Sequence, residues 1–118
     1  MTDQTSSTPT DPRVVKILDR LLKNTQNDEI IWDRGTRGDQ CIFSDLKASV
    51  TIESADGDGQ FPFRVRVLNE DGDLVAGVRF LETSPNGGLA ERLFRAARRN
   101  ALKVDATLDE LLSTLGGD

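Results

Sequence analysis

The stretch 61-FPFRVRVLNEDGDLVAGVRFL-81 holds two runs in which apolar and polar residues alternate, separated by residues 69–73. Alternation with a period of two is typical of strands that bury one face. A two-residue loop at Asp71-Gly72 places Phe63 opposite Phe80 and leaves the Phe/Val positions of both runs on one face. Asp-Gly is also the expected chemistry of a type I′ turn. We therefore predict an antiparallel hairpin with this two-residue loop. The pairs expected in it are Val65 with Val78, Val67 with Ala76, Arg64 with Arg79 and, on the outward face, Leu68 with Val75.

Further strands precede this hairpin. Residues 30–32 are short and β-rich, and residues 41–47 read as a strand that begins at Cys41. Residues 48–53 alternate between apolar and polar side chains, as a half-buried strand does. The segment 55–59, which contains Asp56 and Asp58, resembles the opening of a calcium loop but lacks its later ligands. We interpret it as a solvated turn.

Helices flank the strands. Thr10, Asp11 and Pro12 form a helix-start signal, and apolar residues then recur at helical spacing to predict a helix over 11–24. A second helix is predicted from about 89 to 104. The capping-box pattern of Thr107 and Glu110 predicts a separate third helix, which the two glycines at 116–117 end.

This order of elements predicts an α+β fold. We expect an N-terminal helix, a four- or five-stranded antiparallel meander, and two C-terminal helices packed on one sheet face. Residues 1–10 are predicted to be a disordered leader and 11–118 a single domain.

The composition argues against most catalytic chemistry. The chain has no histidine, no tyrosine and one cysteine, Cys41. The absence of histidine removes Ser-His-Asp and Cys-His nucleophile systems and every His-ligated zinc site. No phosphate-binding loop or dinucleotide fingerprint is present. We therefore expect no enzyme, no cofactor and no metal site. Cys41 is interpreted as a buried strand residue, with a reactive thiol as the alternative.

The bulk character of the chain predicts a cytoplasmic protein without membrane contact. Its net charge is −5, the N-terminus has no basic start followed by an apolar run, and no apolar stretch is long enough to cross a membrane.

Two groups of arginines are candidate partner-binding sites. On the predicted hairpin, Arg64 faces Arg79 with Arg66 on the same outward face, an arrangement that needs compensation. Glu53, an anionic partner or a second subunit are the alternatives for that compensation. On the predicted second helix the candidates are Arg92, Arg95, Arg98 and Arg99. The alternative there is a solvated basic helix face.

The stretch 93-LFRAARRNALKVDATLDELL-112, together with Ile31-Trp32 and residues 67–72, resembles small uncharacterised prokaryotic proteins. These pair an N-terminal helix and a Trp-containing first strand with a meander that carries an Asp-Gly hairpin. The resemblance implies an architecture over about 14–115 and no activity.

The functional hypothesis is a non-enzymatic protein–protein interaction or regulatory module, with a protein partner or self-association. The alternative is a nucleic-acid-associated regulator, antitoxin-like or a phage-defence accessory, that uses the Arg-rich helix.

Overall fold

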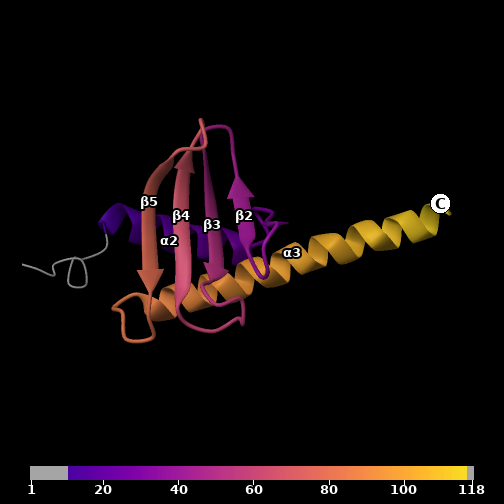
Figure 1. Cartoon of the computed structure of the whole chain (residues 1–118). Coiled ribbons are helices and arrows are strands. Elements are labelled where there is room, and N and C mark those ends of the chain that lie inside the picture. The colour runs from indigo at the N-terminus through magenta and orange to yellow at the C-terminus, as the bar shows by residue number, and fades with distance from the viewer. Residues whose placement is uncertain (1–10, 117–118) are drawn as a thin grey trace, which may run out of the picture.

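The computed structural model describes residues 11–116, so the predicted disordered leader over 1–10 lies outside the described residues. Within these residues, two helices pack against one face of a five-stranded antiparallel sheet (Figure 1). The strands follow one another across the sheet in chain order, which confirms the α+β class and the meander. The elements are α2 (Pro12–Gln26), β1 (Asp33–Arg34), β2 (Cys41–Ser44), β3 (Ala48–Ser54), β4 (Phe63–Asn69), β5 (Leu74–Phe80) and α3 (Gly87–Leu115).

Helix α2 begins where the sequence predicts it. The Asp11 side chain accepts a hydrogen bond from the Arg13 backbone N–H at 2.9 Å, and Pro12 occupies the first turn, where its missing N–H costs nothing. The helix runs two residues past the predicted end at 24. Its buried stripe consists of Val14, Leu18, Leu21, Leu22 and Thr25.

The first strand lies later than predicted. Residues 30–32 are not a strand, and β1 covers only Asp33 and Arg34. The reason is a side chain from α3: Asn100 Oδ1 accepts the Trp32 backbone N–H at 2.8 Å, and Asn100 Nδ2 donates to the Ile30 carbonyl at 3.1 Å. A helix residue therefore takes the hydrogen bonds that a neighbouring strand supplies elsewhere in the sheet.

Strand β2 is shorter than the predicted 41–47. The Asp45 side chain accepts the backbone N–H groups of Lys47 at 2.8 Å and Ala48 at 3.1 Å. An aspartate that bonds to its own downstream backbone forms a turn. The chain therefore reverses at 45–47, and β3 follows directly.

The β4–β5 hairpin has the predicted core register, but the prediction of a two-residue loop is wrong. Phe63 lies opposite Phe80, and the Val65–Val78, Val67–Ala76 and Arg64–Arg79 pairs are confirmed. Leu68, however, lies opposite Leu74 rather than Val75. Residues 70–72 form a three-residue loop, closed by the Asn69 N–H to the Asp73 carbonyl at 2.9 Å, with Gly72 at φ 84°. A bulge between Val67 and Leu68 absorbs the extra loop residue, and so both registers coexist.

The two predicted C-terminal helices are one helix. Helix α3 continues through Thr107 to Leu115 and ends at Gly116, whose φ of 67° is the left-handed cap. No glycine or proline interrupts residues 89–115. Inside a helix the N–H groups after Thr107 already bond to carbonyls four residues earlier, so the capping-box pattern has no free donor to satisfy.

The core lies between the sheet and the two helices. It contains Trp32, Phe63, Phe80, Phe94, Leu18 and Ile52, all almost completely buried. The opposite face of the sheet, which we call the open face, has no helix over it in the described part of the chain (Figure 1). One-sided antiparallel sheets of this kind carry polar residues on the uncovered face.

Candidate protein-interaction surfaces

The charge conflict on the open face is compensated within the chain. Arg64 faces Arg79 on one side and Glu53 on the other. The Arg64 guanidinium donates to the Glu53 carboxylate at 2.9 Å, and the Glu53 side chain is only 7% exposed. The compensation by Glu53, one of the alternatives that the sequence left open, is therefore present in the structure.

The other two open-face arginines are free of this pair. Arg66 lies between Thr51 and Gly77, and Arg79 is exposed at the edge strand β5. Neither forms an ion pair with any residue between 11 and 116. Arg66 and Arg79 therefore remain available to an acidic group.

The four arginines of α3 are all exposed. Arg95 pairs with Glu91 at 3.0 Å, one turn earlier. Arg92, Arg98 and Arg99 form no ion pair within the described range. Since α3 packs on the face opposite Arg64, Arg66 and Arg79, the two groups of arginines lie on opposite sides of the sheet and do not form one site.

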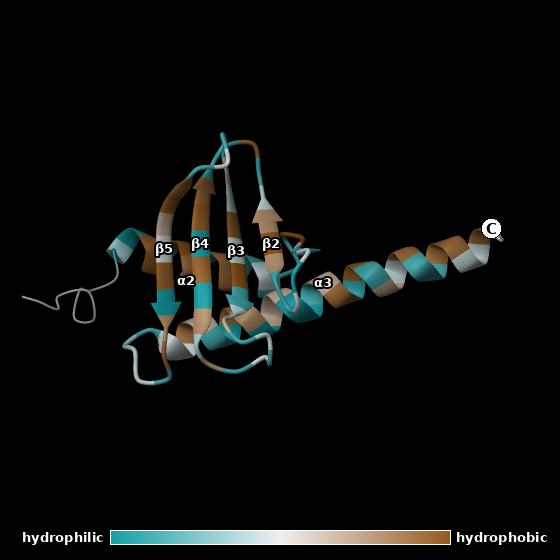
Figure 2. Ribbon diagram, viewed as in Figure 1, coloured by the Kyte–Doolittle hydropathy of each residue, from teal (hydrophilic) through white to brown (hydrophobic). Residues whose placement is uncertain are grey.

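A feature that the sequence analysis missed is the end of α3. The helix leaves the sheet and projects from the body of the domain (Figure 1). Every residue from Ala106 to Gly116 is exposed, and we call this segment the α3 tip. It carries the tip leucines, which are Leu108, Leu111, Leu112 and Leu115, with 54%, 51%, 62% and 77% of their surface exposed. Figure 2 shows hydrophobic bands along this projecting segment.

The leucines themselves were visible in the sequence, but they were assigned to a third helix packed on the domain. Their spacing of i, i+3, i+4 and i+7 is that of one helix face. This face lies outside the core because α3 continues without a break beyond the domain. The apolar face is therefore a surface of the protein.

A groove adjoins the tip leucines. It lies between the segment after α2 and the middle of α3, and we call it the α3 groove. Its lining surface is mostly apolar, and the residues that line it are Ile30, Ile31, Val104, Leu108, Asp28, Asn100, Lys103 and Thr107. Ile31, which lines the groove, is 62% exposed. Leu108 belongs to both the groove and the tip leucines, so the two apolar surfaces adjoin at this residue.

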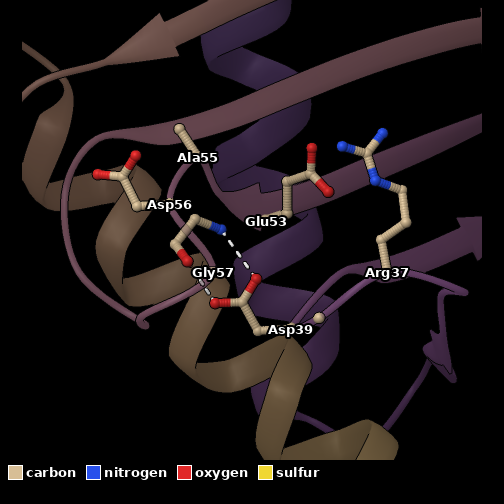
Figure 3. A pocket seen from close by; sticks show the side chains of 8 residues that line it. Arg37, Asp39, Glu53, Ala55, Asp56 and Gly57 are labelled. Atoms are coloured by element: carbon tan, nitrogen blue, oxygen red, sulfur yellow. Dashed lines mark hydrogen bonds between the residues drawn. The ribbon is translucent and has the colours of Figure 1, made fainter.

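A second hollow, polar and shallow, lies at the end of β3 (Figure 3). Asp39 is buried there and accepts the backbone N–H groups of Ser54 and Gly59, each at 3.1 Å, together with the Ser54 hydroxyl. The other carboxylate of the hollow, Glu53, is held by Arg64. Both carboxylates thus already have partners within the chain, and the hydrogen bonds of Asp39 hold the 54–59 loop in place. No signal in the sequence marks Asp39 for this role.

Cys41 is 1% exposed at the start of β2. Burial is the main cause that raises the pKa of its thiol from 9.0 to about 11; the positive charges of Arg98 and Arg34 lower the pKa and the negative charge of Asp39 raises it, each by less than burial does. The buried interpretation of Cys41 is confirmed, and a thiol in this state has little nucleophilic character at neutral pH.

This burial predicts a loss of stability at high pH. Well below pH 9 the thiol is protonated in the folded and unfolded states alike. Between pH 9 and 11 the unfolded chain ionises first, so the free energy of unfolding is expected to fall by about 2–3 kcal/mol. Urea titrations of the wild type and Cys41→Ala across this range measure the effect as a difference in slope. Parallel pH dependences of the two proteins would contradict it.

Residues 11–116 contain neither a helix suited to cross a membrane nor a cluster suited to bind a metal ion. Neither helix among residues 11–116 combines the length and apolar character of a membrane span. The same range contains no cluster of three or more side chains suited to hold a metal ion.

Fold and surface together define a class: a small α+β domain with an uncovered sheet face and a projecting amphipathic helix. No protein-family model, curated protein or solved structure matches the chain.

Proposed function

We propose that this chain is a non-enzymatic protein-interaction module that contacts its partner through the α3 tip and the α3 groove. The observation that carries the proposal is the stripe of four leucines on a helix that has left its own core. Fully burying a leucine side chain is worth about 1.5–3 kcal/mol, so covering these half-exposed residues stabilises the assembly substantially.

The length of the tip supports the same reading. The helical part of the tip, residues 106–115, is exposed throughout and is shorter than the about 12–15 residues at which isolated helices become stable in water. The tip extends a helix that is already nucleated, but most helical stability comes from packing an apolar face. A partner on the tip leucines supplies that packing. Recognition of an amphipathic helix through i, i+3, i+4 and i+7 anchors is a common mode of protein binding.

The open-face arginines have a secondary role in this proposal. Arg64 is neutralised by Glu53, so Arg66 and Arg79 are the residues that offer charge to an acidic partner segment. They lie away from the tip and add a separate contact rather than extend the apolar one.

The second candidate function is association with nucleic acid. It is favoured by the exposure of Arg92, Arg98 and Arg99 on α3 without ion pairs in the described range. Phosphate contacts of this kind weaken steeply with salt. The net charge of −5 opposes it.

Affinity capture with a tagged full chain, with and without nuclease, tests both functions. The variant Leu111→Gln/Leu115→Gln removes apolar surface from the tip without touching the core. Leu46→Gln/Leu81→Gln is the matched control, because Leu46 and Leu81 are 96% and 49% exposed elsewhere. We expect capture that survives nuclease, falls at least tenfold in the tip variant and is unchanged in the control. Capture that disappears with nuclease favours the second function, and equal capture by both variants contradicts the tip.

A further inference from the structure

Strand β5 forms an edge of the sheet, because among the described strands it pairs with β4 alone (Figure 1). An edge strand offers unpaired N–H and C=O groups to a further strand. Along an antiparallel strand these groups point alternately to one neighbour and to the other. The Ala55 N–H donates to the Pro62 carbonyl at 2.8 Å, which directs Pro62 toward β3 and therefore Phe63 toward β5. The Asn69 N–H, which donates to the Asp73 carbonyl at 2.9 Å, obeys the same alternation.

The register of the hairpin carries this alternation into β5. Val65, like Phe63, points toward β5 and lies opposite Val78, so the backbone groups of Val78 bond to β4. Gly77 and Arg79, on either side of Val78, therefore direct their N–H and C=O groups out of the sheet. Both residues are exposed. An extended segment can bond to these groups as an added strand, which is a common mode of protein recognition.

The charges beside this edge indicate what the added strand carries. Across the open face, Glu53, Arg64 and Arg79 lie in one row on β3, β4 and β5. The one carboxylate of this row is bound by Arg64 at 2.9 Å, so the row holds two guanidinium groups and a single acid. A carboxylate on an added strand, directly opposite Arg79, supplies the missing charge.

A second carboxylate is favoured opposite Gly77. Gly77 lies beside Arg66, which forms no ion pair with any residue between 11 and 116. A side chain placed at Gly77 would find only the Leu74 methyl groups nearby, at 3.9 Å. Gly77 therefore leaves room for a long acidic side chain of an added strand to reach over it to Arg66. The residue between the two carboxylates lies on the core face beside Val78, where an apolar side chain fits.

A second copy of β5 does not supply these carboxylates. The strand Leu74–Phe80 contains no acidic residue. Asp73 precedes it, but its N–H donates to Asn69 Oδ1 at 3.0 Å and its carbonyl accepts the Asn69 N–H at 2.9 Å. The backbone of Asp73 therefore has no groups left to bond with Arg79 of another copy. The partner strand comes from a different segment.

We infer that β5 binds an extended acidic segment of a partner protein as an added antiparallel strand, with carboxylates opposite Gly77 and Arg79 and an apolar residue between them. This inference rests on the proposed function, in which the open-face arginines meet an acidic segment, and it names the conformation and chemistry of that segment.

The probe is a fluorescein-labelled peptide in which glutamate, valine and glutamate are flanked by threonines. It is titrated with the full chain to about 1 mM, and binding is followed by fluorescence anisotropy. The control peptide has lysines in place of both glutamates. We expect saturable binding of the glutamate peptide and at least tenfold weaker binding of the lysine peptide, because both charges are reversed. Equal binding of the two, or no binding of the glutamate peptide, overturns the inference.

The variant Arg79→Glu is expected to weaken binding about three- to tenfold, because it replaces an attraction across the strands with a repulsion. Arg99→Glu is the matched control. Arg99 is an exposed arginine of α3, on the other side of the sheet, so its replacement is expected to leave binding unchanged. Equal weakening by the two variants would reveal a general effect of net charge and overturn the inference.

Backbone methylation of the peptide tests strand addition without any change to the protein. In an antiparallel pair the N–H groups of the two glutamates point to β5, and the N–H of the valine points away. N-methylation of the glutamates is expected to weaken binding at least tenfold, and N-methylation of the valine is expected to have a much smaller effect. Equal effects contradict strand addition, and the reverse order contradicts the antiparallel arrangement.

Amide hydrogen exchange, measured by NMR, locates the site. In the free chain the Val78 amide is expected to exchange slowly and the Gly77 and Arg79 amides rapidly. Saturation with the glutamate peptide is expected to slow the exchange of Gly77 and Arg79. Slow exchange of these two amides in the free chain, increasing with protein concentration, would show a second copy at the edge and overturn the inference.

Failure of this inference is distinguishable from failure of the proposed function. The tip variant Leu111→Gln/Leu115→Gln retains β5 and is expected to bind the peptide as the wild type does. A chain that binds the peptide but shows no tip-dependent capture contradicts the proposed role of the α3 tip. Tip-dependent capture without peptide binding overturns the added strand alone.

Discussion

Replacing Trp32 with alanine is expected to lower the free energy of unfolding by about 3–5 kcal/mol. Trp32 is completely buried and joins three parts of the fold. Its indole N–H donates to Thr25 Oγ1 of α2 at 2.8 Å, its ring packs beside Phe43 of β2, and its backbone N–H bonds to Asn100 of α3. Alanine leaves a cavity at this junction. A domain has about 5–15 kcal/mol of stability in all, so the loss is a large part of it.

Urea denaturation followed by far-UV circular dichroism measures the change. Trp32→Phe is the control, since it keeps most of the apolar volume and loses the indole hydrogen bond, at an expected cost of about 1–3 kcal/mol. Equal stabilities of Trp32→Ala and the wild type would show that this junction is not packed as described.

Replacing Asp39 with alanine is expected to cost about 3–5 kcal/mol, because hydrogen bonds to a charged group contribute about 1.5–3 kcal/mol each and Asp39 accepts three. The Ser54 N–H is then buried without its acceptor. The Gly59 N–H keeps the Ser54 hydroxyl at 3.0 Å, so the loss is less than the sum of three bonds.

Two variants control this measurement in the same urea assay. Asp39→Asn retains an acceptor oxygen and is expected to lose about half as much. Asp45→Ala removes a carboxylate that caps an exposed turn and is expected to cost no more than about 1 kcal/mol. If Asp39→Ala and Asp45→Ala lose the same stability, Asp39 has no special role in the 54–59 loop.

The β4–β5 hairpin shows which part of the structure can be predicted from the alternation of apolar and polar residues. The pairing of Phe63 with Phe80 follows from the sequence because a one-residue slip would turn every apolar side chain outward. The loop does not follow, because a bulge lets a three-residue loop serve the same core register. The apolar pattern therefore constrains the buried face, and the loop is decided by local backbone geometry.

The end of α3 shows what the helical periodicity of the sequence cannot predict. The periodicity of residues 107–115 predicts a helix, and a helix is present. A separate helix would need free N–H groups at its start for the capping side chain. In a continuous helix these N–H groups already bond to carbonyls of the preceding turn. The candidate interaction surface was missed for this reason, although its leucines were identified.

For the arginines, too, one part of the arrangement was predicted from the sequence and another part was not. That Arg64 faces Arg79 was predicted from register alone. The burial of Glu53, which neutralises Arg64, and the separation of the sheet arginines from those of α3 required the packed structure.

By itself, the sequence determined the α+β class, the helix that begins after Asp11, the meander and the apolar face of its hairpin. These depend on periodicity and capping, which are local properties of the chain. Only the tertiary structure decided that Asn100 replaces a strand partner at Trp32, that Asp39 holds the 54–59 loop, and that the tip leucines face outward. Those outcomes join residues far apart in the chain, or depend on whether a helix meets anything to pack against, and no local pattern encodes them.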